Sequence, residues 1–158
     1  MHEYRVTKYN PALRTAAGAY SREEWHRFCH IGEMFDGRVF TLAEYQQVES
    51  AYIKAALTFM RSTNVERLSV CGLENSARIP LSFTEGDELT LEQSAGVLRS
   101  LLREDYWCKL ETLDAFIHVG WDYYLYIGVS QPTDAARREA EALGLYMESF
   151  PSPYRPRG

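Results

Sequence analysis

Three short runs rich in β-branched and aromatic residues follow one another near the end of the chain, and they constrain the fold more than any other feature. The runs are YWCKLET, AFIHV and YYLYIGV, at residues 106–112, 115–119 and 123–129. The links between them, Leu113-Asp114 and Gly120-Trp121, have the two-residue length of tight hairpin loops. Because loops this short join only antiparallel neighbours, the sequence predicts an antiparallel meander.

Helical patterns lie before and after this meander. The reciprocal side-chain pattern that caps a helix start occurs three times, at Ser21 with Glu24, Thr41 with Glu44, and Thr90 with Gln93. We therefore predict helices over about 22–30 and 42–61 and from 91 onward, and a fourth, DAARREAEAL, after Thr133. The stripe at three- and four-residue spacing in 42–61 predicts a core-facing helix. Gly96, inside the third helix, predicts a close contact with a neighbouring helix.

The remaining strand patterns complete the fold prediction. EYRVTKY, ERLSVCGL and LYMESF read as strands, and Asp36-Gly37 is a turn signal. The predicted order is β-α-α-β-α-β-β-β-α-β, an α+β fold of two layers, with a mostly antiparallel sheet and the helices on one face. We expect one domain over residues 1–150 and a Pro-rich tail over 151–158. The second sheet face, with no helix left to cover it, is where we look for function.

Composition narrows the class of protein. The chain has 158 residues and a net charge of −5, which disfavours nucleic acid as a partner because that affinity depends on clustered Lys and Arg. The first residues contain no apolar signal segment, and no apolar run approaches the roughly 20 residues that span a bilayer. Three cysteines without C-x-x-C spacing indicate reduced thiols. We expect a cytoplasmic protein that contacts no membrane and needs no cofactor.

The aromatic hairpin supplies the first candidate binding residues. With Gly120-Trp121 as a two-residue turn, one face would carry Phe116, His118, Tyr123, Leu125 and Ile127, and we assign it to the core. The other face would carry Ile117, Val119, Asp122, Tyr124 and Tyr126, a composition typical of a protein-binding patch. The alternative is that Tyr124 and Tyr126 pack under the last helix or the tail. Trp121, in the turn, either folds back onto its strand or meets a partner.

A second candidate is the acidic segment TEGDELTLE, which contains Glu85, Asp87, Glu88 and Glu92. Carboxylates here complement the dipole of the following helix, and that explains some of them without any function. The same group could instead steer a basic partner toward the protein, or bind a divalent cation. We include Glu85, Asp87 and Glu88 in the candidate partner surface.

Catalytic and metal-binding signals are weak. His26, Cys29 and His30 have helical spacing that could hold a metal ion, but the sequence fixes no fourth ligand. A helix with an apolar inner face and solvent-facing histidines explains the pattern better. Glu49 interrupts the apolar stripe of helix 42–61, where it must be paired, with Arg5 or a tyrosine hydroxyl for example, or act as a general base. The sequence lacks the common nucleotide-binding and acyl-transfer motifs.

The segments EYRVTKYNPALR, GAYSREEW, HIG, DGRVF and TLAEYQQVESAYI resemble a group of small bacterial proteins of similar length. Proteins of this size and acidic, aromatic character are similar to immunity proteins, which neutralise secreted bacterial toxins. The resemblance implies a protein partner, such as a basic toxin domain, and carries over no site residue. We expect a non-enzymatic binding protein, monomeric or homodimeric. The alternative is a small metal- or carboxylate-dependent hydrolase that uses the His26/His30 region.

Overall fold

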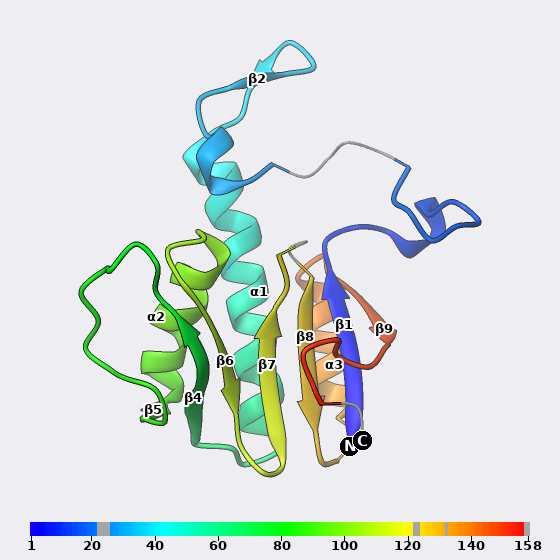
Figure 1. Cartoon of the computed structure of the whole chain (residues 1–158). Helices are drawn as coiled ribbons and strands as arrows, with labels where there is room; N and C mark the ends of the chain where they lie inside the picture. The colour runs from blue at the N-terminus through cyan, green and yellow to red at the C-terminus, as the bar shows by residue number, and fades with distance from the viewer. Residues whose placement is uncertain (22–25, 122–123, 132, 157–158) are drawn as a thin grey trace.

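A seven-stranded antiparallel sheet forms the centre of the computed structural model, which describes residues 1–21, 26–121, 124–131 and 133–156 (Figure 1). Across the sheet the strands run β5-β4-β6-β7-β8-β1-β9. Their bounds are β1 His2–Thr7, β4 Arg67–Glu74, β5 Glu88–Thr90, β6 Trp107–Glu111, β7 Ala115–Val119, β8 Leu125–Val129 and β9 Tyr146–Ser149. The predicted meander is β6-β7-β8.

Three helices pack against one face of this sheet: α1 Leu42–Ser62, α2 Leu91–Leu102 and α3 Asp134–Ala142. The α+β prediction is therefore confirmed. Both α1 and α2 begin with the predicted capping boxes. At the start of α1, the Thr41 N–H donates to the Glu44 carboxylate at 2.8 Å, and the Glu44 N–H donates to the Thr41 hydroxyl at 3.2 Å. The apolar stripe of α1 is buried in the core, with Tyr52, Phe59 and Met60 almost fully covered. No described helix is long and apolar enough to cross a membrane.

Two local predictions about the helices are wrong. Within the predicted helix 22–30, residues 22–25 lie outside the described part of the chain, and the remainder forms only a 3-10 turn, η2, over Phe28–His30. Arg27 before it is extended, with φ −79° and ψ 168°. Gly96 marks no close helix contact, because a Cβ atom added there would meet no atom within 4 Å.

The turn signal at Asp36-Gly37 is confirmed by a small hairpin. It joins β2 Met34–Phe35 to β3 Arg38–Val39 and stands out from the body beyond the N-terminal end of α1 (Figure 1). Asp36 and Gly37 have φ values of 50° and 75°, the left-handed conformation that a type I′ turn needs at both central positions. A short 3-10 turn, η1 Pro11–Leu13, precedes it in the chain.

The register of the β7–β8 hairpin differs from the prediction. The Gly120 N–H donates to the Tyr124 carbonyl over 2.8 Å, so the loop contains three residues instead of two. Ile117 therefore pairs with Ile127, and His118 with Tyr126. Val119 pairs with Leu125 instead of the predicted Asp122, a shift of three positions. Because side chains alternate along a strand, an odd shift moves every β7 side chain to the other face relative to those of β8.

The helix-covered face consequently carries a different set of side chains from the one predicted. Alternate residues of both strands belong to the apolar core beneath the helices: Ala115, Ile117, Val119, Leu125, Ile127 and Val129. Phe116 and His118, which we assigned to the core, lie with Tyr126 on the helix-free face. Of the predicted core set, Tyr123 lies outside the described residues.

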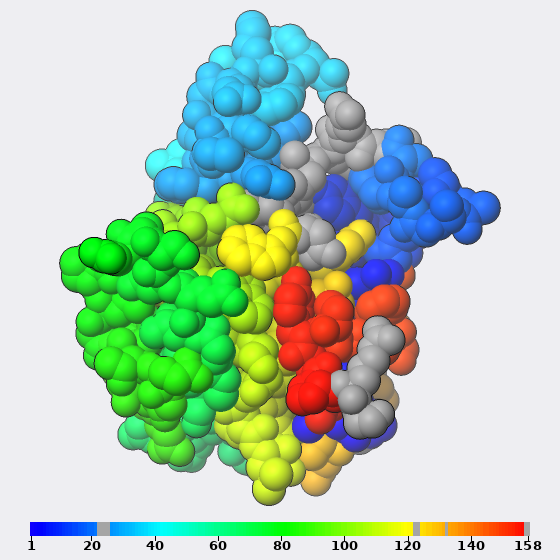
Figure 2. Space-filling view, in the orientation of Figure 1, coloured from blue at the N-terminus to red at the C-terminus, as the bar shows by residue number. Residues whose placement is uncertain are grey.

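The helix-free face is itself covered near its middle. Residues 150–156, here called the strap, leave β9 and cross over this face (Figures 1 and 2, red). Beneath the strap, Phe116 and Tyr126 are each only 3% exposed. As expected, no helix covers this face, but the tail does, so the search for a binding surface moves to what the strap leaves open.

Candidate binding site

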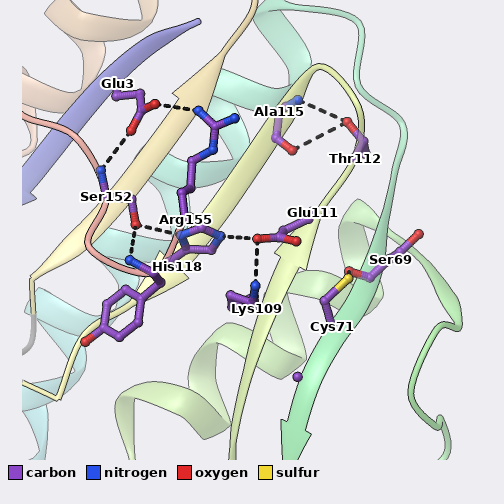
Figure 3. Close-up of polar contacts among 12 residues, drawn as sticks. Glu3, Ser69, Cys71, Lys109, Glu111, Thr112, Ala115, His118, Ser152 and Arg155 are labelled. Atoms are coloured by element: carbon purple, nitrogen blue, oxygen red, sulfur yellow. Dashed lines mark hydrogen bonds and ion pairs between the residues drawn. The ribbon is translucent and has the colours of Figure 1, made fainter. Parts of the chain in front are cut away.

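Glu3, on β1, holds the strap at three points. Its carboxylate accepts a hydrogen bond from the Ser152 N–H at 2.8 Å and pairs with the Arg155 guanidinium at 2.6 Å (Figure 3). Its backbone carbonyl accepts from the Phe150 N–H at 3.2 Å. The strap is therefore bound to the sheet by backbone and side-chain contacts along most of its length.

A buried histidine provides the next anchor. His118 is fully covered, with its Nδ1 atom 2.7 Å from the Ser152 hydroxyl and its Nε2 atom 2.8 Å from the Glu111 carboxylate (Figure 3). The Tyr154 N–H donates to the same hydroxyl at 3.3 Å. Because an ionised carboxylate can only accept, Nε2–H donates to Glu111, and in the neutral ring Nδ1 then accepts from the Ser152 hydroxyl. Burial lowers the pKa of His118 to about 4.

Serine, histidine and a carboxylate are also the residue types of a hydrolase triad. A nucleophile must reach its substrate, however, and Ser152 is 5% exposed beneath its own strap. Its hydroxyl is already engaged with His118 and with the Tyr154 N–H, both of which belong to the folded arrangement of the strap. We interpret this chain of hydrogen bonds as the fastening of the strap to β6 and β7.

Two stacked tryptophans lie beside the strap, where β7 ends. The indoles of Trp107 and Trp121 have centroids 6.4 Å apart and planes inclined by 20°. Trp107 is fixed, since its Nε1–H donates to the Val119 carbonyl at 2.9 Å and its ring lies 5.3 Å from that of Tyr154. Trp121 remains 55% exposed. The outer indole is thus held in place from below while more than half of its surface meets solvent.

The tryptophan pair borders a pocket of about 210 Å³, here called the tryptophan pocket. Its wall combines aromatic rings with three carboxylates and two small residues. They come from the end of β4 and the loop after it, from the segment that joins α2 to β6, and from the two tryptophans. The lining residues are Glu74, Ser76, Ala77, Glu104, Asp105, Tyr106, Trp107 and Trp121. Such a wall suits a ligand group that is both flat or apolar and positively charged.

Of the four predicted hairpin residues, Trp121 alone is exposed in the part of the chain that the structure describes. Asp122 lies outside the described residues. Tyr124 is half-buried: its hydroxyl lies 3.4 Å from Arg14 and its ring beneath the Arg5 guanidinium. Tyr126 is covered by the strap, with Phe150 and Tyr154 at ring distances of 6.3 and 5.9 Å. The expected exposed tyrosine patch is therefore wrong for Tyr126, for which the alternative of packing under the tail is correct.

The acidic segment does not join the tryptophan pocket. The Glu85 carboxylate accepts hydrogen bonds from the N–H groups of Gly72 and Leu73, at 2.8 and 2.7 Å, where the β4–β6 pairing is irregular. These bonds lower the pKa of Glu85. Asp87 accepts from the Thr84 N–H at 2.8 Å. Both side chains therefore hold the loop before β5 in shape, while Glu88 is exposed on that outermost strand.

The candidate metal ligands have other partners. His26 stacks on Phe35 at 3.8 Å, and the Nδ1 atom of His30 accepts from the Arg27 N–H at 3.0 Å. Cys29 is exposed. The described residues contain no group of three or more His, Cys, Asp or Glu side chains placed to hold a metal ion. No contact among these residues favours the hydrolase alternative.

Glu49 is paired, although with other residues than the examples we gave. Both of its carboxylate oxygens accept hydrogen bonds from the Arg103 guanidinium, at 2.8 and 2.9 Å, and Arg99 lies 3.4 Å away. Both arginines come from the α2 end, whereas Arg5 pairs with Glu148 on β9. The 4% exposed carboxylate thus ties α1 to α2.

The two thiols on the central strands are not activated. Burial raises the pKa of Cys108 to about 12 and also raises the pKa of Cys71. A nucleophilic thiol needs the opposite change, because the thiolate is the reactive form. These observations give no support to thiol catalysis at either position.

Trp107 and the pocket carboxylates Glu74, Glu104 and Asp105 were missed by sequence reasoning. Comparison of the chain with protein-family models, with curated proteins and with solved structures finds no match. The site's own residues must therefore carry any inference about function. The exposed, braced Trp121 and its acidic pocket are the features that the fold does not explain.

Proposed function

We propose that this chain is a non-enzymatic protein-binding module that acts as an immunity protein and neutralises a bacterial toxin by covering a basic surface on it. The observation that carries the proposal is the position of Trp121, which is 55% exposed yet stacked on the fixed ring of Trp107. Exposed tryptophans held in place in advance are the typical anchors of protein interfaces, because little side-chain freedom is lost on binding.

The charge around this anchor supports a basic partner. Glu74, Glu104 and Asp105 surround the indoles, and the whole chain carries a net charge of −5. Opposite charges on two proteins speed their encounter and exclude partners of the wrong sign. The mechanism we propose is blockade: carboxylates guide the toxin domain toward the pocket, and the indole holds it there.

The test is neutralisation of the protein encoded by the gene next to this one, since toxin and immunity genes lie side by side. Cells that produce that protein should stop growing, and co-production of this chain should restore growth. Trp121→Ala should abolish the rescue. Leu113→Ala is the matched control, because Leu113 is 92% exposed in the β6–β7 turn, away from the pocket, and rescue should persist.

Folding of both variants is checked by their thermal midpoints, which should lie within a few degrees of the parent. Two results would contradict the proposal. One is the absence of rescue by the parent chain, and the other is full rescue by a folded Trp121→Ala protein.

A further inference from the structure

We infer that the tryptophan pocket takes the side chain of one arginine on the partner protein. This inference rests on the proposed function and adds the chemistry by which the partner is recognised. It joins three features of the same place: a small cavity, a stacked pair of indoles and unpaired carboxylates.

The size of the cavity favours a single side chain. At about 210 Å³ it is smaller than the roughly 300–1,000 Å³ of typical small-molecule sites. It opens beside Trp121, at the surface where a partner protein would lie. A long side chain that projects from a partner can enter such a pocket while the rest of the partner stays outside.

The indoles favour a planar cation. The Trp107 ring lies nearly parallel to the Trp121 ring with centroids 6.4 Å apart, and Trp121 is still 55% exposed, which leaves indole surface open to a ligand. Cations are attracted to the face of an indole, and tryptophan is the strongest of the aromatic residues in this respect. The guanidinium group can also lie flat on the ring, whereas the rounded ammonium group of lysine cannot.

The carboxylates supply the charge. Neither Glu74 nor Asp105 makes an ion pair with any residue that the structure describes, and both are exposed. Glu104 lies 3.6 Å from the Arg27 guanidinium, in an open and therefore weak pair. An arginine that stacks on Trp121 would bring its N–H groups toward the carboxylate oxygens of Glu74 and Asp105, which have no ion-pair partner among the described residues. Two N–H groups directed at one carboxylate is the geometry that arginine forms and lysine does not.

The experiment titrates the protein with N-acetyl-arginine amide and follows the indole N–H signals of Trp107 and Trp121 by NMR. We expect a saturable shift at millimolar ligand. N-acetyl-lysine amide should bind at least about threefold more weakly, because it lacks the planar group. N-acetyl-citrulline amide has nearly the same shape without the charge and should produce no saturable shift.

Variants locate the binding. Trp121→Ala should remove the response of Trp107, and the double change Glu74→Gln with Asp105→Asn should weaken arginine binding at least fivefold. The control is Glu66→Gln with Glu139→Gln, two exposed positions outside the pocket that give the same change in net charge. The control should bind arginine as the parent does.

A response to citrulline equal to that of arginine, or equal weakening in the control, would overturn the inference. Its failure differs from failure of the proposed function. If neutralisation depends on Trp121 but the protein shows no response to arginine, only the inference that the pocket takes an arginine is refuted. A selective arginine response without neutralisation would refute only the immunity role.

Discussion

The packing around Gly128, in β8, leaves no room for a side chain at this position. A Cβ atom at this position would lie 2.0 Å from a ring carbon of Phe116, the residue directly opposite it on β7. The Phe116 ring lies over Gly128 and is itself covered by the strap, with the Arg155 guanidinium 5.4 Å from its centre. The ring therefore has no open side into which it could move.

We predict that Gly128→Ala lowers the free energy of unfolding by about 1–3 kcal/mol, the usual cost of forcing extra volume into a packed region. Gly96→Ala is the matched control, because its Cβ would contact nothing and alanine favours a helix by up to about 1 kcal/mol. Urea denaturation of both proteins measures the difference. Equal stabilities would contradict the packing described for Phe116.

His118 makes stability depend on pH. Its pKa is lowered from 6.5 to about 4 in the folded protein, so the unfolded chain binds a proton first as the pH falls. The stabilisation is fully present above pH 6.5 and is lost progressively toward pH 4. The difference between the two pKa values is worth at most about 3 kcal/mol.

We therefore predict that the free energy of unfolding falls between pH 6.5 and pH 4 and that His118→Asn, although less stable, has a flatter profile in this range. His2→Asn, at the exposed start of β1, should keep the slope of the parent. NMR titration of the His118 ring gives the pKa directly. A value near 6.5 would show that the ring is not sealed as described.

Prediction of single residues from the sequence succeeded where a polar residue interrupted an apolar pattern. Glu49 on an apolar stripe had to be paired, because a buried charge without a partner is costly. Its partners, Arg103 and Arg99, could not be identified, since they depend on how α2 lies beside α1. The chain of Ser152, His118 and Glu111 left no signal of this kind, because serine and glutamate are ordinary residues in tails and strands.

At the scale of elements, the local signals at α1, α2 and the β2–β3 turn were correct, whereas the signal for a helix over 22–30 and the predicted length of the β7–β8 loop were wrong. The capping boxes of α1 and α2 and the Asp36-Gly37 turn depend on neighbouring residues, and the structure has them. The β7–β8 loop has one residue more than its glycine suggested. The error put the β7 residues on the wrong face relative to β8, so we predicted His118 in the core although it lies on the helix-free face, and we missed the contact of Trp107 with Trp121.

The strap is the element whose role the sequence concealed most. Its Pro-rich composition indicated a tail, but its contacts reach Glu3, at the other end of the chain. We predict that Ser152→Ala lowers the free energy of unfolding by about 1–3 kcal/mol, because it leaves the buried Nδ1 atom of His118 without a donor.

The control for the strap is Ser149→Ala, at an exposed position of β9, which should change stability by less than about 0.5 kcal/mol. Thermal unfolding followed by circular dichroism measures both variants. If Ser152→Ala is as stable as Ser149→Ala, the hydroxyl does not fasten the strap and the interpretation of the hydrogen-bond chain is wrong.

At the scale of the whole molecule, the apolar core lies on one side of the sheet and the proposed binding site on the other. One face is covered by the three helices, and the strap covers the middle of the other. The tryptophan pocket lies beside the strap, and Tyr154 connects the two. Its ring packs on Trp107, and its hydroxyl accepts a hydrogen bond from the backbone N–H of Trp121 at 3.4 Å. The overall fold was predictable from element order, whereas the site depended on strand register and on where the tail lies.

The dissociation constant of the complex between this chain and the neighbouring gene's product, compared for the parent, Trp121→Ala and Leu113→Ala, tests the central claim most directly. Loss of a central tryptophan costs about 2 kcal/mol or more at an interface, so we predict at least a roughly 30-fold weaker complex for Trp121→Ala and no change for Leu113→Ala. Equal dissociation constants for all three proteins would contradict the account.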